Sequence, residues 1–143
     1  MGTAATISFE KKDKTIRTIY VHWDGYPKGV GAILFKHYDD TNLDKLMDLG
    51  DLSVLGTTPV SDPNGWDYRV ETPDHLCVAY KDRGEDSPAY TYKSMDAFRH
   101  AHNSLEYNYL YSEGKWYVWS GQLGNRTPKP LEDFLTKEER GGR

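Results

Sequence analysis

The sequence predicts an α+β fold, in which an antiparallel β-sheet is covered on one face by short helices. Two hairpin patterns, one near each end of the chain, supply the sheet. The stretch between them holds short segments with helical spacing, separated by turns rich in glycine and proline. The chain has 143 residues, which suits a single domain spanning 1–143. We expect frayed tails at 1–6 and 136–143.

Both hairpins follow from alternating patterns around short turns. Residues 7–10 alternate between apolar and polar, residues 16–21 are rich in β-branched side chains, and a charged turn joins them. The second hairpin has alternating tyrosines over 107–111 and returns through the aromatic run 116–119. β-Branched and aromatic residues favour strands, and aromatic pairs across a hairpin stabilise it by up to about 1 kcal/mol each.

Four helices are expected from apolar positions spaced three or four residues apart. They cover residues 27–38, residues 41–50, a segment after Ser94 and a last segment from Pro130. Their apolar stripes are Val30, Ile33, Leu34 and His37; Leu43, Leu46 and Met47; Met95, Phe98 and His102; and Leu131, Phe134 and Leu135.

The remaining segments are predicted from turn residues and short apolar runs. Residues 51–56 indicate a turn of helix or an irregular packed segment, and residues 57–75, with three prolines, indicate the longest loop. Trp66 and Tyr68 are expected to pin this loop to the body of the protein. Short strands are expected at 76–80 and 89–92, and a linker at 124–128.

Composition and charge exclude several classes of protein. The longest nearly apolar run, Gly29 to Phe35, is far shorter than the ~20 residues of a membrane-spanning helix, and no signal-peptide pattern follows the N-terminus. The single Cys77 excludes an internal disulfide and a multi-cysteine zinc site. A net charge of −4 argues against a broadly basic nucleic-acid binder. We expect a cytoplasmic protein without a cofactor.

The turn from His22 to Pro27 has the highest density of chemistry-bearing residues. His22 and Asp24 could bind a metal or form an acid–base pair, or they could hydrogen-bond the turn. We favour the structural role and assign neither a catalytic residue nor a metal ligand. Tyr26 belongs to the same turn, and Gly29 and Gly31 would let an anion such as a nucleotide phosphate approach the backbone amides of the following helix.

Two further candidate sites lie later in the chain. Arg83, in a charged turn, could grip a carboxylate or phosphate, or pair with Asp82 or Glu85. The rings of Tyr109, Tyr111 and Trp119 could form an exposed contact surface for a protein, or pack into the core on both faces. Tyrosine and tryptophan are enriched at interface hot spots, whereas the shortage of nearby basic residues argues against nucleic acid.

Several separated motifs resemble a group of small proteins of tailed phages and prophages. The strongest is Ile19-Tyr-Val-His-Trp-Asp-Gly-Tyr-Pro27, followed by the leucine- and glycine-rich segment 46–56. Ala79-Tyr-Lys-Asp-Arg-Gly-Glu85 and the aromatic hairpin from Tyr107 extend the likeness. The resemblance implies a phage accessory protein, and it implies no reaction, cofactor or catalytic residue.

Three functional hypotheses follow from the sequence, and the one that ranks last is a metal-dependent hydrolase that uses His22, Asp24 and a distant carboxylate. The first is a non-enzymatic protein that binds a host or antiviral-defence protein in the cytoplasm of the infected bacterium through its aromatic hairpin and neighbouring loops, and inhibits or redirects it. The alternative is a small-ligand binder that sequesters a nucleotide or a nucleotide-derived defence signal at the His22–Gly31 turn, with Arg83 contributing. The oligomeric state stays open.

Overall fold

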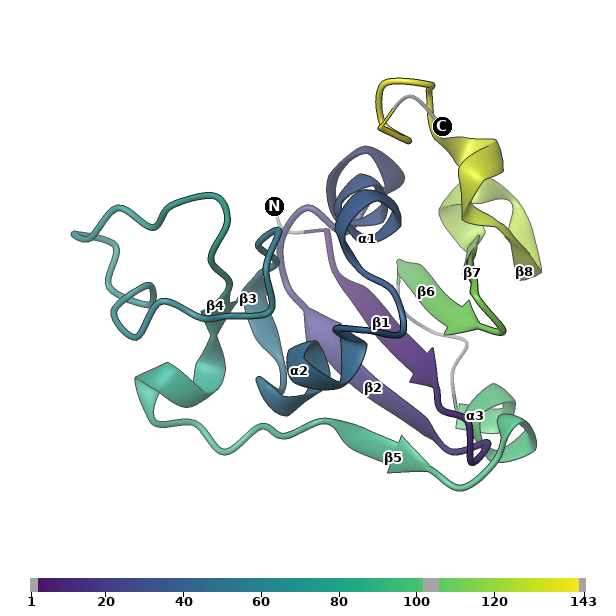
Figure 1. The fold of residues 1–143 in the computed structure, drawn as a ribbon, viewed down its shortest axis with the longest axis horizontal. Helices are drawn as coiled ribbons and strands as arrows, with labels where there is room; N and C mark the ends of the chain where they lie inside the picture. Colours follow the sequence, from purple (N-terminus) through teal and green to yellow (C-terminus); the bar gives the residue numbers. More distant parts are fainter. Residues whose placement is uncertain (1–2, 102–105, 142–143) are drawn as a thin grey trace.

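The computed structural model describes residues 3–101 and 106–141 and shows an α+β fold. An eight-stranded mixed sheet runs in the order β4-β3-β2-β1-β6-β7-β8, and β5 also pairs with β2 (Figure 1). The strands are β1 (Ala5–Glu10), β2 (Ile16–Val21), β3 (Leu52–Val54), β4 (Val78–Ala79), β5 (Tyr90–Tyr92), β6 (Tyr107–Ser112), β7 (Lys115–Ser120) and β8 (Asn125–Pro130). The helices are α1 (Ala32–His37), α2 (Leu43–Asp48) and α3 (Met95–Ala101), with a π-helical turn η1 (Pro27–Gly31) before α1 and three short 3₁₀ turns, η2 (Tyr80–Arg83), η3 (Gly121–Leu123) and η4 (Leu131–Phe134).

The sheet is mixed, which corrects the expectation of a purely antiparallel one. Within each predicted hairpin the strands pair antiparallel, β1 with β2 and β6 with β7. The two hairpins, however, join through their first strands, and β1 and β6 run parallel, with Ile7 opposite Tyr109. Strand β3 also runs parallel to β2. Sequence patterns within a hairpin carry no information on the direction in which a second hairpin joins it.

Helices lie on both faces of the sheet, not on one face as predicted. Successive side chains of a strand point to opposite faces. On one face, Ile7 and Tyr109 pack in a cluster with Leu34 of α1 and Leu43 of α2. On the other face, Phe98 of α3 packs in a separate cluster with Ile16, Leu110 and Trp119. His102, which was expected to continue the stripe of α3, lies outside the described residues.

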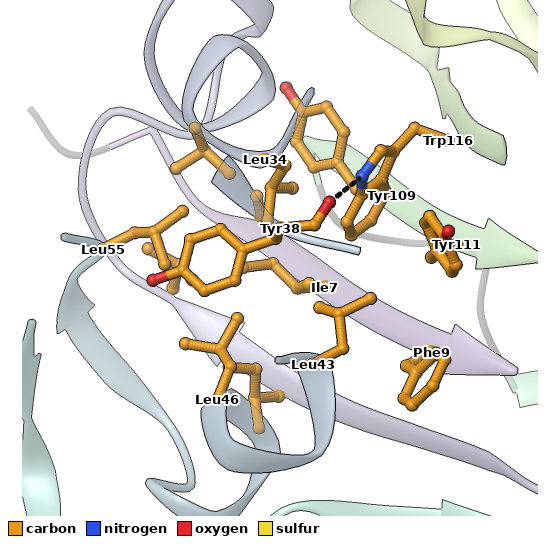
Figure 2. Close-up of a cluster of buried hydrophobic side chains, with 14 of the residues drawn as sticks. Ile7, Phe9, Leu34, Tyr38, Leu43, Leu46, Leu55, Tyr109, Tyr111 and Trp116 are labelled. Carbon is orange, nitrogen blue, oxygen red and sulfur yellow. Dashed lines mark hydrogen bonds between the residues drawn. The ribbon is translucent and has the colours of Figure 1, made fainter. Parts of the chain in front are cut away.

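The larger cluster is rich in aromatic rings (Figure 2). Tyr38, which follows α1, lies across the sheet, and its hydroxyl donates to the carbonyl of Gly56 at 2.8 Å. Its own carbonyl accepts a hydrogen bond from the Trp116 indole at 3.0 Å. Both polar groups are therefore satisfied inside an apolar core, where an unpaired one would cost about 1–3 kcal/mol.

Three segments differ from their predicted structure. Residues 51–56, expected as a helical turn or an irregular segment, contain strand β3. The predicted linker at 124–128 lies in strand β8, an edge strand that tolerates Pro128 and Pro130 because one side of its backbone forms no ladder. The predicted tail at 1–6 overlaps β1, where Ala5 is fully buried.

The described part of the C-terminal segment 136–143 is held by hydrogen bonds. The amide of Arg140 donates to the carbonyl of Thr136 at 3.0 Å, and the Arg140 guanidinium donates to the carbonyl of Leu135 at 2.9 Å. Among the helices of residues 3–101 and 106–141, none has the length and the apolar composition needed to cross a membrane.

Candidate functional site

The His22–Pro27 turn connects β2 to η1 through hydrogen bonds to its neighbours. His22 Nδ1 lies 2.8 Å from the hydroxyl of Tyr20, and the His22 amide donates to the carbonyl of Leu52. Asp24 has a positive φ of 60° and accepts a hydrogen bond from Tyr26 at 3.3 Å. The negative charge of Asp24 raises the pKa of the Tyr26 hydroxyl. The two candidate residues His22 and Asp24 thus have partners inside or beside the turn.

The glycines after this turn allow close packing of the chain on itself. A Cβ on Gly29 would lie 2.4 Å from the carbonyl oxygen of Asp24, and one on Gly31 would lie 3.2 Å from the ring of Tyr109. The amides that were expected to meet an anion donate within the turn: Gly29 N bonds to Tyr26 O at 3.0 Å, and Val30 N to Asp24 O at 2.8 Å. The structure therefore favours a packing role for both glycines.

This geometry leads us to expect no nucleotide-dependent stabilisation of the protein. An occupied site would raise the free energy of unfolding by about 2.7 kcal/mol at a ligand concentration one hundred times its dissociation constant. We expect the Tm to stay within about 1 °C across a panel of ATP, GTP, cyclic mononucleotides and cyclic dinucleotides, measured by differential scanning fluorimetry. A reproducible shift of several degrees with any of them would restore the nucleotide hypothesis.

Arg83 has partners of its own in the turn that contains it. Its Nε donates to Glu85 at 2.6 Å, and its guanidinium stacks over the ring of Tyr80 with 5.1 Å between Cζ and the ring centroid. Of the two pairings that the sequence left open, the structure has the one with Glu85. Arg83 also lines a hollow of about 120 Å³ with Val54 and Trp66, and no residue of the His22–Gly31 turn lines it.

The rings of the second hairpin are buried, which corrects the expectation of an exposed contact surface. Tyr109 has no exposed area and donates its hydroxyl to the carbonyl of Gly25 at 2.6 Å. Burial raises the pKa of this hydroxyl. Tyr111 packs edge-on against Trp116, and Trp119 packs edge-on against Phe98. Tyr109 and Tyr111 pack in the cluster with residues of α1 and α2, and Trp119 packs with Phe98 of α3, so these three rings belong to the core.

A groove of about 770 Å³ lies between the turns of the two hairpins. Phe9 and Tyr111 contribute its aromatic part. Three positively charged residues line it, Lys11, Lys12 and Lys14. Five negatively charged residues line it as well: Glu10, Asp13, Asp40, Asp44 and Glu113. The carboxylates outnumber the amines, so the groove does not favour a phosphate.

Exposed apolar side chains gather instead on the loop between β3 and β4. Among the described residues, eight large apolar side chains are exposed, and five of them lie on the loop 57–75 or at the end of β3 beside it: Val54, Val60, Trp66, Tyr68 and Val70. Tyr68 is 95% exposed, the highest value among them. Figure 1 shows this loop extending away from the sheet, beyond β3 and β4. We call residues 57–75 the projecting loop.

The projecting loop is held by hydrogen bonds at its base and within itself. Thr58 N donates to His75 O at 3.0 Å, Asp62 N donates to Cys77 O at 2.9 Å, and Cys77 N donates to Val60 O at 2.8 Å. The Trp66 indole donates to the carbonyl of Pro63 at 3.1 Å. The loop that carries the exposed rings is therefore fixed at its two ends by backbone hydrogen bonds.

Tyr68 does not pin the loop to the body as predicted, because it is 95% exposed, whereas Trp66 is partly covered and lines the hollow with Val54 and Arg83. Sequence reasoning named both residues but missed that their rings are exposed. Trp66 is 47% exposed, and its indole bonds within the loop. Loops run over the surface and frequently carry function. Two aromatic rings in a stretch rich in proline and aspartate were the available signal, because such a stretch has few apolar neighbours to cover them.

Neither a reactive thiol nor a cluster of side chains that could bind a metal is found in the described part of the chain. Burial raises the pKa of the Cys77 thiol, which accepts a hydrogen bond from Gly56 N at 3.2 Å. Within residues 3–101 and 106–141, no group of three or more histidine, cysteine, aspartate or glutamate side chains is arranged to hold a metal ion. Comparison of the chain with protein-family models, with curated proteins and with solved structures finds no match.

Proposed function

We propose that this chain is a phage accessory protein that binds a host or antiviral-defence protein in the cytoplasm of the infected bacterium and inhibits or redirects it without catalysis. The observation that carries the binding role is the set of apolar side chains on the projecting loop, led by Tyr68 and Trp66. Tyrosine and tryptophan are among the residues that contribute most to protein interfaces. The sequence resemblance to small phage proteins supports the proposal that the protein acts in an infected bacterium.

The ordered base of the loop supports the same role. A partner that binds a pre-formed loop does not have to order it, which lowers the entropic cost of association. The hydrogen bonds of Thr58, Asp62 and Cys77 hold the loop at its two ends. The rings of Trp66 and Tyr68 are thus presented between two fixed points.

Replacing both rings with serine, in the variant Trp66→Ser/Tyr68→Ser, is expected to abolish binding while leaving the fold intact. The two rings are exposed, so the free energy of unfolding should change by less than about 1 kcal/mol in total. Loss of two interface rings should raise the Kd of the partner by about 30-fold or more. Wild-type and variant baits are compared by pull-down from infected and uninfected host lysate, followed by titration of the captured protein.

The matched control is Tyr90→Ser on β5. This ring is 63% exposed but lies outside the projecting loop, so the control should capture the partner as the wild type does. If the double variant captures the same protein with the same Kd and inhibits phage defence equally well, the projecting loop is not the binding site and the proposal fails.

A further inference from the structure

The negative charge of the chain is concentrated in the segment that carries the projecting loop. Between Asp39 and Asp86 the sequence has twelve acidic and four basic side chains, whereas the rest of the chain has ten acidic and fourteen basic ones. From Asp51 to Asp86, which spans the loop and the strands at its base, the numbers are eight and three. The modest net charge of the whole chain therefore combines an acidic segment of the sequence with a remainder that has more basic than acidic side chains.

Asp44 and Asp48 pair with Lys11 and Arg17, which lie outside the segment from Asp39 to Asp86, so only the acidic excess from Asp51 to Asp86 bears on the projecting loop. Arg69 forms a fork with Asp67, with Nε and Nη2 each 2.9 Å from a carboxylate oxygen. This pairing lowers the pKa of Asp67 and raises that of Arg69. Arg83 pairs with Glu85. Two of the three basic side chains between Asp51 and Asp86 are thereby neutralised by neighbours in the sequence.

Exposed carboxylates then stand beside the exposed apolar side chains. Glu71 and Asp74 are exposed on the same loop as Trp66 and Tyr68, and Asp86 is exposed after η2. No ion pair of Glu71 or Asp74 occurs among the described residues. The loop therefore offers rings for burial and negative charge around them.

We propose that the projecting loop docks on a basic protein surface that has an apolar recess, such as the nucleic-acid-binding groove of a host or defence protein; this inference rests on the proposed function. The rings would supply the buried contact, and the carboxylates would complement lysine and arginine side chains of the partner. Grooves that bind single strands combine basic residues with aromatic ones on which bases stack. The rings of the loop would stack on these aromatic residues, and its carboxylates would pair with the basic ones.

The same charge disfavours other occupants of the loop. A nucleic acid or an anionic membrane would be repelled by Glu71, Asp74 and their neighbours. A second copy of the loop would place like charges together. The carboxylates also predict a kinetic signature, since charges at an interface act mainly on the association rate and are screened by salt.

The test uses the full chain as bait and a defined fraction of host lysate as probe. The lysate is treated with nuclease and passed over cellulose that carries single-stranded DNA, and the retained proteins are offered to the bait with and without an excess of a 30-nucleotide single strand. We expect one protein to be captured from this fraction and displaced by the single strand. Its association rate should fall at least about tenfold in the neutralised variant Glu71→Gln/Asp74→Asn and should fall with added salt.

The matched control is Asp133→Asn/Glu138→Gln, which removes two exposed carboxylates near the C-terminus and should leave the association rate within about twofold. Capture only from the proteins that DNA-cellulose does not retain, or equal rates for Glu71→Gln/Asp74→Asn and the wild type, would overturn the inference. Binding of the bait to the single strand itself, or loop-dependent dimerisation, would overturn it as well.

These outcomes separate the two proposals. If the serine variant Trp66→Ser/Tyr68→Ser loses the partner while the neutralised variant keeps it, the loop binds a protein but the partner is not chosen by positive charge. If neither variant loses the partner, the proposed function fails together with the inference.

Discussion

Tyr109→Ala is expected to lower the Tm by about 10 °C, the first of the two largest effects that we expect. The ring is fully buried in the larger hydrophobic cluster, and a Cβ on Gly31 would lie 3.2 Å from it. Replacing a buried aromatic ring with alanine costs about 3–5 kcal/mol, because it removes apolar contacts and leaves a cavity. For a chain of this length, each kcal/mol lowers the Tm by about 3 °C.

Tyr109→Phe separates the hydroxyl from the ring. It leaves the carbonyl of Gly25 without its buried donor, so we expect a loss of about 1–3 kcal/mol. Thermal and urea unfolding, followed by circular dichroism, measure both variants, and Tyr90→Ala on the exposed side of β5 serves as the control. A Tm within about 2 °C of the wild type for Tyr109→Ala would show that this ring is not part of the core.

Gly56→Ala is expected to destabilise the base of the projecting loop by about 2–3 kcal/mol. A Cβ at this position would lie 2.4 Å from the carbonyl carbon of Leu76, 2.5 Å from its oxygen and 2.7 Å from the oxygen of His75. All three are backbone atoms, so relief requires the two ends of the loop to move apart. Overpacking of this kind costs about 1–3 kcal/mol and occasionally more.

The buried thiol of Cys77 reports on that movement. In the wild type the thiol is fully buried beside Gly56, so Ellman's reagent should react with it only as the protein opens. In Gly56→Ala we expect the reaction under native conditions to accelerate by about 30-fold or more, which corresponds to the loss of about 2 kcal/mol of protection. Gly121→Ala is the control, because a Cβ there meets nothing within 4 Å; equal reactivity in all three proteins would contradict the expected opening.

The variants at Tyr109 and Gly56 change two different parts of the molecule, the core of the sheet and the base of the projecting loop. Tyr109 belongs to the core that supports the sheet, and Gly56 belongs to the joint from which the projecting loop extends. A variant at Gly56 should weaken partner binding through the position of the rings, even though it removes neither Trp66 nor Tyr68. The geometry of the projecting loop therefore depends on a packed glycine.

The hairpins could be predicted from the sequence because their signals are local. Strands β1 and β2 pair over the segments that alternate or contain β-branched residues, with Ile7 opposite Ile19. Strands β6 and β7 pair through the aromatic run, with Tyr111 opposite Trp116. In both, the partner strand lies a few residues away, and a short turn sets the register. The same reasoning predicted α2 and its buried Leu46.

The exposure of the aromatic rings could not be predicted in the same way. Tyr109 is buried because η1 and α1, distant in the sequence, pack on its face of the sheet, and Trp119 is buried because Phe98 of α3 packs on the other face. Trp66 and Tyr68 are exposed because the loop extends beyond the strands that could have covered them. An aromatic ring suits a core and an interface equally well, so its type alone does not decide between them.

The sequence by itself determined the α+β class and the two hairpins, since each depends on residue type and short-range spacing. Only the tertiary structure decided the parallel pairing of β1 with β6 and the presence of helices on both faces of the sheet. It also decided that the hairpin rings are buried and the loop rings exposed, the reverse of what was expected. These features depend on contacts between segments up to about a hundred residues apart, such as the hydrogen bond from Thr6 to Asn108. Whether a side chain is buried is decided by such contacts.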